Sequence, residues 1–526
     1  MGSYLNPGNE AFAVALNSEI YVDKTGLLTY TNKVMNTLQG YICNSRPRRF
    51  GKSITANMLT AYYSKGCSSK EMFSGLEISR AKDFEKHLNQ YDVLHWDIQW
   101  CMEPAGGPER IVSYISEKTI SELKEYYPHI LPEEIRSLPE ALSRINAASG
   151  TKFIVIIDEW DVLIRDEAAD LKTQEEYINF LRAMFKGTEP TKYIQLAYLT
   201  GILPVKKYGT HSALNMFDEF TMLDPGPLAE YVGFTEQEVE ELCGRYQMDL
   251  AEIKNWYDGY SFPGESSVYS PRSVVNAMRF RKIGNYWNQT ETFEALQWYI
   301  DLNFDGLRDD VLQMMAGKKI PVNTGSFTND MTTFRTEDDV LTLLIHLGYL
   351  GYEEQNKYVF IPNAEVQSEY ASAVTVSQWG DISKALKNSA DLLQAVWEKQ
   401  ETQVAEGIRL AHFETSQLQY NDENALSYTI SLALYAARNF YTVYRELPGG
   451  KGFADLVFVP RKRYQDKPAL VVELKWDKTA EGALAQIKDK EYCRSLEEYQ
   501  GNLLLVGINY NKKTKEHVCR IEEYQK

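Results

Sequence analysis

Gly51, Lys52 and Ser53 form a sequence that can bind the phosphates of a nucleotide. They follow the apolar run 40–43 and precede a segment, 53–65, whose apolar residues have helical spacing. In such a loop, backbone N–H groups wrap the phosphates, the lysine reaches the β- and γ-phosphates, and the serine hydroxyl binds Mg²⁺. Arg46 occupies the position of the first glycine in the usual pattern. Gly-Lys-Ser alone arises by chance in about a quarter of chains this long, so a second element is needed.

That second element is the apolar run 153–157, which ends in Asp158 and Glu159. Asp158 at the tip of a buried strand is placed to hold Mg²⁺ through water, and Glu159 to polarise the attacking water. Another apolar run, 193–201, ends in Thr200, which can sense the γ-phosphate. The alternative is a solvated strand end. Because the three elements occur together, they favour an ATP site.

A second group of reactive residues lies near the C-terminus. Asp455 begins a strand-like run, and Glu473 and Lys475 lie two residues apart in another, so these two share a face. The intervening segment has hairpin character, which brings the two runs together. Two carboxylates and a lysine can bind Mg²⁺ and cleave a phosphodiester, in a D-x17-E-x-K arrangement typical of PD-(D/E)XK nucleases. The alternative is a nuclease relic that is retained for packing or for binding nucleic acid.

The elements that position these residues predict an α/β protein of three domains. Residues 1–227 alternate strands with helices, which indicates a mainly parallel P-loop sheet. Residues 228–377 are helical, and a helix over 337–347 followed by two short strands suggests a winged helix; a packing domain with a hairpin is the alternative. Residues 378–526 begin with long helices, 381–406 and 424–439, and end as a compact α/β unit.

Composition sets further limits. The net charge of −17 argues against nonspecific coating of nucleic acid, although residues 449–526 hold 15 Lys and Arg against 12 Asp and Glu. The six cysteines and seven histidines are scattered, which argues against disulfides and a zinc site. No apolar stretch has the length of a membrane span and the first residues do not resemble a signal peptide, so we expect a cytoplasmic protein without membrane contact.

Five motifs resemble a family of AAA-ATPase-like proteins common in anaerobic bacteria. They are YVDKTG (21–26), RPRRFGKS (46–53), DEWD (158–161), LTG (199–201) and WYDGY (256–260). The family also replaces the first P-loop glycine, so the resemblance implies that Arg46, Arg48 and Arg49 belong to the nucleotide-binding loop. We expect a purely structural role for WYDGY.

The resemblance covers most of the chain, because family members carry a C-terminal PD-(D/E)XK nuclease-type domain. Glu446, Gly452 and Asp455 resemble that domain's lead-in, and Gln486 with Tyr492 matches its QI…Y signature. Gln486 therefore joins Asp455, Glu473 and Lys475 as a predicted catalytic residue. Glu423 resembles a further acid of such domains.

The leading hypothesis is an ATPase whose nucleotide state controls a Mg²⁺-dependent nuclease. The alternatives are an ATP-gated signalling switch with an inert nuclease fold, and an ATP-dependent DNA-binding protein that uses the winged helix. The sequence leaves open the choice between DNA and RNA, a homo-oligomer, and an arginine finger, for which nothing selects Arg182 or Arg245.

Overall fold

The computed structural model divides the chain into two compact units. One unit comprises Met1–Tyr286 with Pro321–Asn363, and the other comprises Trp287–Ile320 with Ala364–Lys526. The residues described are 2–165, 169–205, 214–262, 265–287, 296–297, 299–300, 306–325, 327, 334–376, 380–415, 423–449, 452–490, 492, 496 and 501–524. Each unit is treated by itself. The proposed boundary at 377/378 lies outside the described residues, and the three-domain division stays a prediction.

The first unit is built on a parallel sheet with the strand order β2-β3-β4-β1-β5. The strands are β1 (Tyr41–Ser45), β2 (Asp92–Asp97), β3 (Phe153–Asp158), β4 (Ile194–Gly201) and β5 (Asp218–Phe220). Apart from His95 and Asp97 of β2 and the start of β5, their side chains are mostly buried, which explains why β1, β3 and β4 read as continuous apolar runs. The predicted strands are confirmed, whereas β2 is not predicted because His95 and two aspartates interrupt its apolar pattern.

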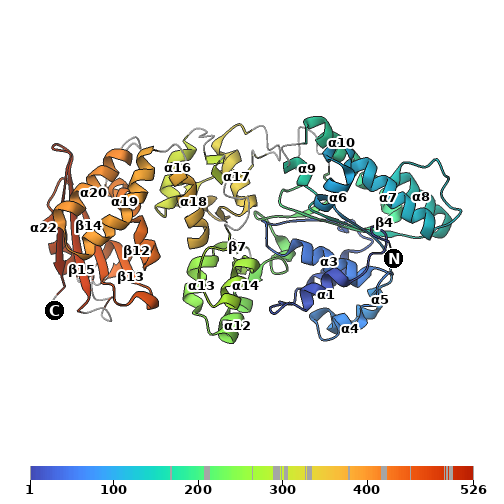
Figure 1. Ribbon diagram of the computed structural model, residues 1–526, viewed down its shortest axis with the longest axis horizontal. Coiled ribbons are helices and arrows are strands. Elements are labelled where there is room, and N and C mark those ends of the chain that lie inside the picture. Colours follow the sequence, from blue (N-terminus) through green and yellow to red (C-terminus); the bar gives the residue numbers. More distant parts are fainter. Residues whose placement is uncertain are drawn as a thin grey trace. The chain divides into compact units, whose positions relative to one another are not determined.

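Helices cover both faces of this sheet (Figure 1). One face packs in a core with α1, α2 and α3, and α6 to α10 lie on the other. Their bounds are α1 (Glu10–Leu16), α2 (Gly26–Val34), α3 (Lys52–Tyr63), α4 (Lys70–Phe73), α5 (Phe84–His87), α6 (Ile98–Ala105), α7 (Ile111–Tyr126), α8 (Leu138–Ser149), α9 (Val162–Arg165), α10 (Leu171–Phe185) and α11 (Pro190–Tyr193).

The rest of the first unit is a helical region with two small β elements. Its elements are β6 (Phe234–Thr235), α12 (Glu236–Tyr246), α13 (Leu250–Tyr257), β7 (Tyr260–Phe262), β8 (Glu265–Tyr269), α14 (Pro271–Phe280), α17 (Glu337–Leu347), β10 (Gly351–Glu353) and β11 (Tyr358–Phe360). The expected helix and hairpin are present, because β10 and β11 pair antiparallel directly after α17. A nucleic-acid-binding winged helix remains a proposal. Gly259 of WYDGY has φ +114°, and a Cβ there would lie 2.2 Å from the Pro362 carbonyl oxygen, so this motif requires its glycine.

The second unit packs helices against a five-stranded sheet with the order β12-β13-β14-β15-β16. All pairs are antiparallel except β14 with β15. The elements are α16 (Leu307–Met315), α18 (Ala364–Val376), α19 (Gly380–Trp397), α20 (Glu401–Thr415), α21 (Glu423–Ala433), β12 (Tyr441–Gly449), β13 (Gly452–Pro460), β14 (Ala469–Trp476), α22 (Ala480–Asp489), β15 (Leu503–Asn511) and β16 (Glu516–Glu523).

Two features of the second unit differ from expectation. The single helix predicted over 381–406 is wrong, because the chain breaks between α19 and α20, where Lys399 has φ +56°. The sheet also has two more strands than predicted, β12 and β16. Within the described residues, no helix combines the length and apolarity needed to cross a lipid bilayer.

Gly201→Ala should destabilise the first unit. A Cβ at position 201 would lie 2.6 Å from Asp161 Oδ1 and 2.7 Å from a ring carbon of Trp160, and both side chains are fully buried. Overpacking of this kind costs about 1–3 kcal/mol. Gly244→Ala is the matched control, because nothing lies within 4 Å of its Cβ inside helix α12. Thermal melts should show a lower Tm for Gly201→Ala and an equal or higher Tm for Gly244→Ala; an unchanged Tm for the former would contradict this packing.

Candidate functional sites

The carboxyl ends of the parallel strands bring the predicted nucleotide-site residues together. Asp158 of β3 pairs with Thr200 of β4, which pairs with Asn44 of β1. On the other side, Asp158 pairs with Asp97 at the end of β2. The loop that leaves β1 leads directly into α3. Polar residues from four strands therefore meet at the edge where open α/β sheets bind ligands.

The loop between β1 and α3 has the shape of a phosphate-binding turn. Gly51, the N-cap of α3, has φ +96°, and Arg49 has φ +70°. The Nζ atom of Lys52 donates a hydrogen bond to the Pro47 carbonyl oxygen at 2.9 Å, so the lysine folds back over the loop. Burial lowers the pKa of Lys52, and the nearby Glu159 and Asp158 carboxylates oppose that shift. The loop therefore holds a cation at the N-terminus of a helix, where an anion is favoured.

Asp158 lies beside the start of α3. Its side chain is 3% exposed, it interacts with Ser53, and its Oδ1 accepts from the Glu159 N–H at 3.0 Å. Burial raises its pKa to about 7, and the Ser53 hydrogen bond and Lys52 only partly offset this. Mg²⁺ is commonly bound through one or two carboxylates together with substrate phosphates and water. The Ser53 hydroxyl and the Asp158 carboxylate fit this set of ligands.

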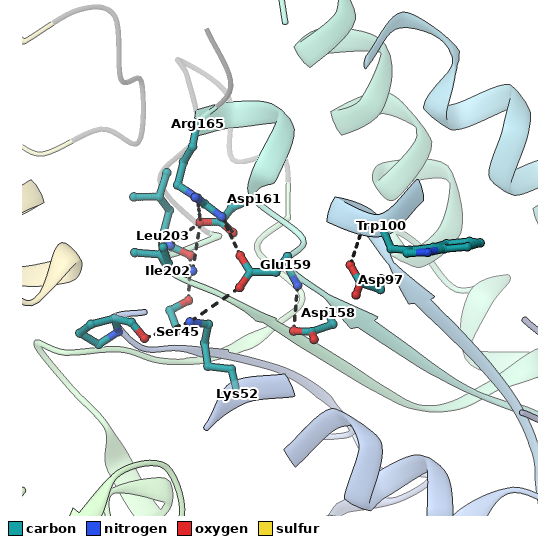
Figure 2. A network of polar contacts seen from close by, with 11 residues as sticks. Ser45, Lys52, Asp97, Trp100, Asp158, Glu159, Asp161, Arg165, Ile202 and Leu203 are labelled. Carbon is teal, nitrogen blue, oxygen red and sulfur yellow. Dashed lines mark hydrogen bonds and ion pairs between the residues drawn. The ribbon is translucent and has the colours of Figure 1, made fainter. Parts of the chain in front are cut away.

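Glu159 is held between two cations (Figure 2). Its Oε2 accepts from Arg165 at 2.7 Å, and its Oε1 lies 3.9 Å from Lys52 Nζ. The backbone of Glu159 is left-handed, with φ +51°, which turns its side chain out of the strand direction. At 23% exposure this carboxylate is still reached by water.

Arg165 also binds Asp161. Its Nε lies 2.9 Å from Asp161 Oδ2, and the same oxygen accepts from the N–H groups of Ile202 and Leu203 at 3.0 and 2.8 Å. Asp161 is fully buried, so these donors stabilise its charge. Asp161 thereby joins the turn after β3 to the end of β4.

The three arginines of the loop do not act as one group. Arg46 is fully buried, and its guanidinium donates to the carbonyls of Ser45, Phe220 and Leu228. This geometry makes Arg46 a structural anchor rather than the predicted nucleotide ligand. Arg49 donates to the Tyr286 carbonyl at 2.8 Å and also lines the cavity described next, whereas Arg48 is exposed. Only Arg48 and Arg49 keep a side chain near the surface of the loop.

A cavity of about 440 Å³ lies beside the first turns of α3, a size that suits a nucleoside. It is lined by the loop and by segments distant in sequence, including Tyr21, Val22, Ile54, Tyr231, Arg272 and Arg279. The YVDKTG motif contributes three of its residues to the lining, Tyr21, Val22 and Lys24.

Thr200 is buried at the sheet edge, and its Oγ1 has no hydrogen-bond partner among the described residues.

The predicted nuclease residues also converge. Leu456 of β13 pairs with Val472 of β14, which places Asp455 beside Glu473, and Asp455 Oδ2 accepts from the Leu474 N–H at 2.7 Å. Glu473 is 2% exposed, and its Oε1 lies 2.8 Å from Lys475 Nζ. Gln486 of α22 donates to the same oxygen.

Helix α22 reaches this cluster because it packs closely over Gly507, which has no side chain. Gly507 of β15 pairs with Glu473, and a Cβ at position 507 would lie 2.4 Å from the Ala480 carbonyl oxygen. Gln486 lies 3.2 Å from the Tyr492 hydroxyl, and burial raises the pKa of Tyr492, which keeps this phenol neutral. The side chains of Glu423 and Glu446 lie outside the described part of the structure.

The donor set decides which metal this cluster fits. Within the described residues, no group of three or more His, Cys, Asp and Glu side chains is placed to hold a metal ion. Asp455 and Glu473 are two carboxylates, the number with which Mg²⁺ is commonly bound when water and phosphate oxygens complete its shell. The cluster fits Mg²⁺ rather than a closed zinc site.

The sequence does not indicate every residue of these sites. Four such residues lie outside the sequence motifs: Arg165, Gly507 and the two α14 arginines that line the cavity, Arg272 and Arg279. For Arg165, the only signal is its position four residues after Asp161 in a short helix, the spacing of an ion pair.

The two clusters define a chain that joins a P-loop nucleotide-binding fold to a nuclease-type α/β fold. Comparison with known families agrees: residues 10–210 match the predicted AAA-ATPase family, and residues 423–519 match the PD-(D/E)XK nuclease superfamily. The chain therefore carries an AAA-ATPase-like domain and a PD-(D/E)XK-type domain, as the sequence motifs predict.

Individual proteins resemble the chain at low sequence identity. The uncharacterized protein in the vnfD 5′ region of Azotobacter chroococcum mcd 1 is 27% identical over 283 residues, which are 52% of this chain and 51% of the relative. The match thus spans about half the length of this curated relative. The Aeropyrum pernix ORC2 protein (13% identity, 68% of this chain, 96% of that chain) has a TM-score of 0.31. Cdc6p from Pyrobaculum aerophilum (9% identity, 71% and 99%) has a TM-score of 0.26. Both scores are too low to define a shared overall fold.

Arg165→Ala should slow ATP hydrolysis and leave ATP affinity nearly unchanged, because Arg165 orients Glu159 and does not reach the loop. We expect turnover to fall about tenfold, with a smaller loss in Arg165→Lys, which keeps the charge. Arg144→Ala is the control, since Arg144 forms an exposed ion pair with Glu140 at 2.8 Å on the surface of α8.

Steady-state kinetics of Glu159→Gln, Arg165→Ala and the double variant test whether the two residues act as a unit. The double variant should be no slower than Glu159→Gln alone. Losses that simply multiply would show that Arg165 acts independently of Glu159.

Proposed function

We propose that this protein binds and hydrolyses ATP with Mg²⁺, and that its nucleotide state controls Mg²⁺-dependent cleavage of nucleic acid at the C-terminal domain. The observation that carries the proposal is the presence, on one chain, of two clusters in which buried carboxylates lie beside a buried lysine. ATP, DNA or RNA are the partners this chemistry implies. The proposal includes a cytoplasmic location and a homo-oligomer.

In the nucleotide site, each residue has a role set by its position. Lys52 leaves the Pro47 carbonyl and meets the β- and γ-phosphates, while the loop N–H groups wrap them. Ser53 and Asp158 would hold Mg²⁺, which would offset negative charge on the phosphates. Glu159, held by Arg165, accepts a proton from the attacking water, and Thr200 donates its unused hydroxyl to the γ-phosphate.

In the nuclease site, Asp455 and Glu473 would hold Mg²⁺, which would activate a water molecule and offset negative charge on the scissile phosphate. Lys475 orients the attacking water and balances the buried charge of Glu473. Gln486 holds the Glu473 carboxylate in place from α22. Lys475 and Gln486 both donate hydrogen bonds to the Glu473 carboxylate, which supports this arrangement.

A cleavage screen tests the proposal directly. Labelled single- and double-stranded DNA and RNA are incubated with and without Mg²⁺ and ATP. The coupled function is supported if the wild type cleaves only with Mg²⁺ and its cleavage rate changes with ATP. In Lys52→Ala, ATP should no longer change the cleavage rate. Hydrolysis without cleavage of any substrate supports the alternative, an ATP-gated switch with an inert nuclease fold.

Lys52→Ala should abolish ATP binding, because it removes the cation that meets the phosphates. Glu159→Gln should keep ATP bound but slow hydrolysis by about 100-fold or more, and Asp158→Asn should weaken hydrolysis more than binding. Lys192→Ala, a change of a surface lysine paired with Glu189, is the control. Calorimetry that gives the Lys52 variant wild-type affinity would overturn the P-loop assignment.

Asp455→Asn should abolish cleavage without unfolding the domain. Asn keeps an oxygen that accepts from the Leu474 N–H, and the change relieves repulsion between two adjacent carboxylates. Stability without Mg²⁺ should therefore be equal or slightly higher. The stabilisation that Mg²⁺ gives the wild type should disappear, because a ligand that binds only the folded state raises Tm.

Two further variants complete this test. Lys475→Gln should keep the Mg²⁺-dependent rise in Tm but lose cleavage, and the surface change Asp466→Asn should alter neither. If Mg²⁺ shifts no melting curve and nothing is cut, the nuclease fold is a relic.

A further inference from the structure

Four polar side chains form a row across the carboxyl edge of the parallel sheet in the first unit. Asp97 at the end of β2 pairs with Asp158 at the end of β3, and Figure 2 shows both strand ends. Asp158 pairs with Thr200 of β4, which pairs with Asn44 of β1. Asp158 and Thr200 already have roles in the proposed nucleotide site. Asp97, the outermost member of the row, has none.

The row faces the helix that carries the phosphate-binding lysine, α3. Side chains alternate between the two faces along a strand, so residues two apart share a face. The ring of His95, two residues before Asp97, hydrogen-bonds Thr60 of α3 at 2.9 Å. Ile156, two residues before Asp158, packs in the same core cluster as the apolar residues of α3. Both carboxylates therefore point to the side of the sheet that α3 covers.

Two members of the row have buried polar atoms that no described residue satisfies. These atoms are Asn44 Oδ1 and Thr200 Oγ1, and both residues are 1% exposed. A buried polar atom without a partner destabilises a fold, and each one needs an explanation. Their position beside the phosphate-binding loop indicates that a polar ligand completes the row.

One oxygen of the Asp97 carboxylate caps a helix. Asp97 Oδ1 accepts from the Trp100 N–H at 2.9 Å, at the start of α6. The residue is exposed, and within the described part of the chain it forms no ion pair. It lies close enough to Asp158 for the two charges to repel each other. Like charges opposite each other on neighbouring strands are destabilising, and a cation beside them removes this repulsion.

The cation of the proposed nucleotide site has the coordination chemistry that this pair requires. Mg²⁺ loses its water reluctantly and keeps several water molecules when it binds to one or two carboxylates and to phosphates. Asp158 interacts with Ser53, the proposed serine ligand, whereas Asp97 lies one strand further from the loop. Asp97 is therefore placed to accept hydrogen bonds from water on the ion rather than to bind the ion itself.

We propose that Asp97 is a positioning residue of the nucleotide site, which holds water molecules bound to Mg²⁺ and so strengthens binding of the Mg²⁺–nucleotide complex. This inference rests on the proposed binding of ATP and Mg²⁺, and it adds a residue that no sequence motif contains. The role concerns binding, so it can be tested without turnover.

The experiment measures the dissociation constant of the full-length protein for a fluorescent mant derivative of AMP-PNP, a non-hydrolysable ATP analogue, in excess Mg²⁺ and in EDTA. The ratio of the EDTA value to the Mg²⁺ value equals, by linkage, the gain in Mg²⁺ affinity when the nucleotide enters the protein. Asp97→Asn and Asp97→Ser remove the charge but keep a good helix cap. Asp249→Asn is the matched control, because Asp249 caps α13 in the same way and accepts from the Ala251 N–H at 2.8 Å.

Both Asp97 variants should lower this ratio about tenfold, a loss typical of residues that hold a metal-bound group. Affinity in EDTA should be equal or slightly higher, because a negative charge near the phosphates is removed. The Tm of the nucleotide-free protein, and every value for Asp249→Asn, should stay as in the wild type. An unchanged ratio would overturn the proposal and leave Asp97 as a helix cap. A ratio that falls only together with Tm and with affinity in EDTA would also overturn it, because that is the result of a structural role.

Asp158→Asn separates the role of Asp97 from the proposed function. If Asp158→Asn lowers the ratio and the Asp97 variants do not, the Mg²⁺ site stands and the role of Asp97 is wrong. A wild type that binds the analogue equally well in Mg²⁺ and in EDTA would overturn both the Mg²⁺ site and the role of Asp97. A wild type that binds no analogue would overturn the P-loop assignment as well.

Discussion

The arrangement of the nucleotide site depends on the carboxylate of Asp161. This group is fully buried, and a single oxygen accepts from the Ile202 and Leu203 N–H groups and from Arg165. A buried charge is tolerated only when such donors surround it, so these contacts cannot be exchanged individually. They fix the turn that follows β3 to the end of β4. The ion pair that orients Glu159 follows from this connection, because Arg165 binds both Asp161 and Glu159.

The hydrogen-bond donors around each carboxylate distinguish Asp161, which supports the fold, from Asp158, which we propose as a Mg²⁺ ligand. Asp161 has its full set of donors inside the protein. Asp158 is almost as deeply buried, yet its donors do not offset burial, and its pKa rises to about 7. A carboxylate with an incomplete set of donors is one that a metal ion completes. These environments support the proposal, first made from the position of Asp158 at the strand tip, that Asp158 rather than Asp161 is the Mg²⁺ ligand.

Much of the fold and of both candidate sites follows from the sequence, because buried parallel strands are continuous apolar runs and their carboxyl ends must meet. Asp158 and Thr200 meet for this reason, and the two-residue spacing of Glu473 and Lys475 places them on one face of β14. Arg46 could not be predicted in this way. Its partners, the carbonyls of Phe220 and Leu228, lie 174 and 182 residues away, and no local pattern encodes such contacts. The sequence does not predict strand β12 either. Its charged residues and Pro448 interrupt the apolar pattern, as is common for an edge strand.

The substitutions that make this P-loop unusual also connect it to the rest of the first unit. Where the common pattern has its first glycine, Arg46 lies 5.4 Å from the centre of the Phe262 ring, and Phe50 of the same loop packs edge-on against Tyr260 at 5.5 Å. Tyr260 in turn donates a hydrogen bond to the Gly348 carbonyl at the end of α17. A glycine in the loop would leave these contacts unmade, because it has no side chain. These contacts connect the loop through Tyr260 to α17, the helix that precedes the β10–β11 hairpin.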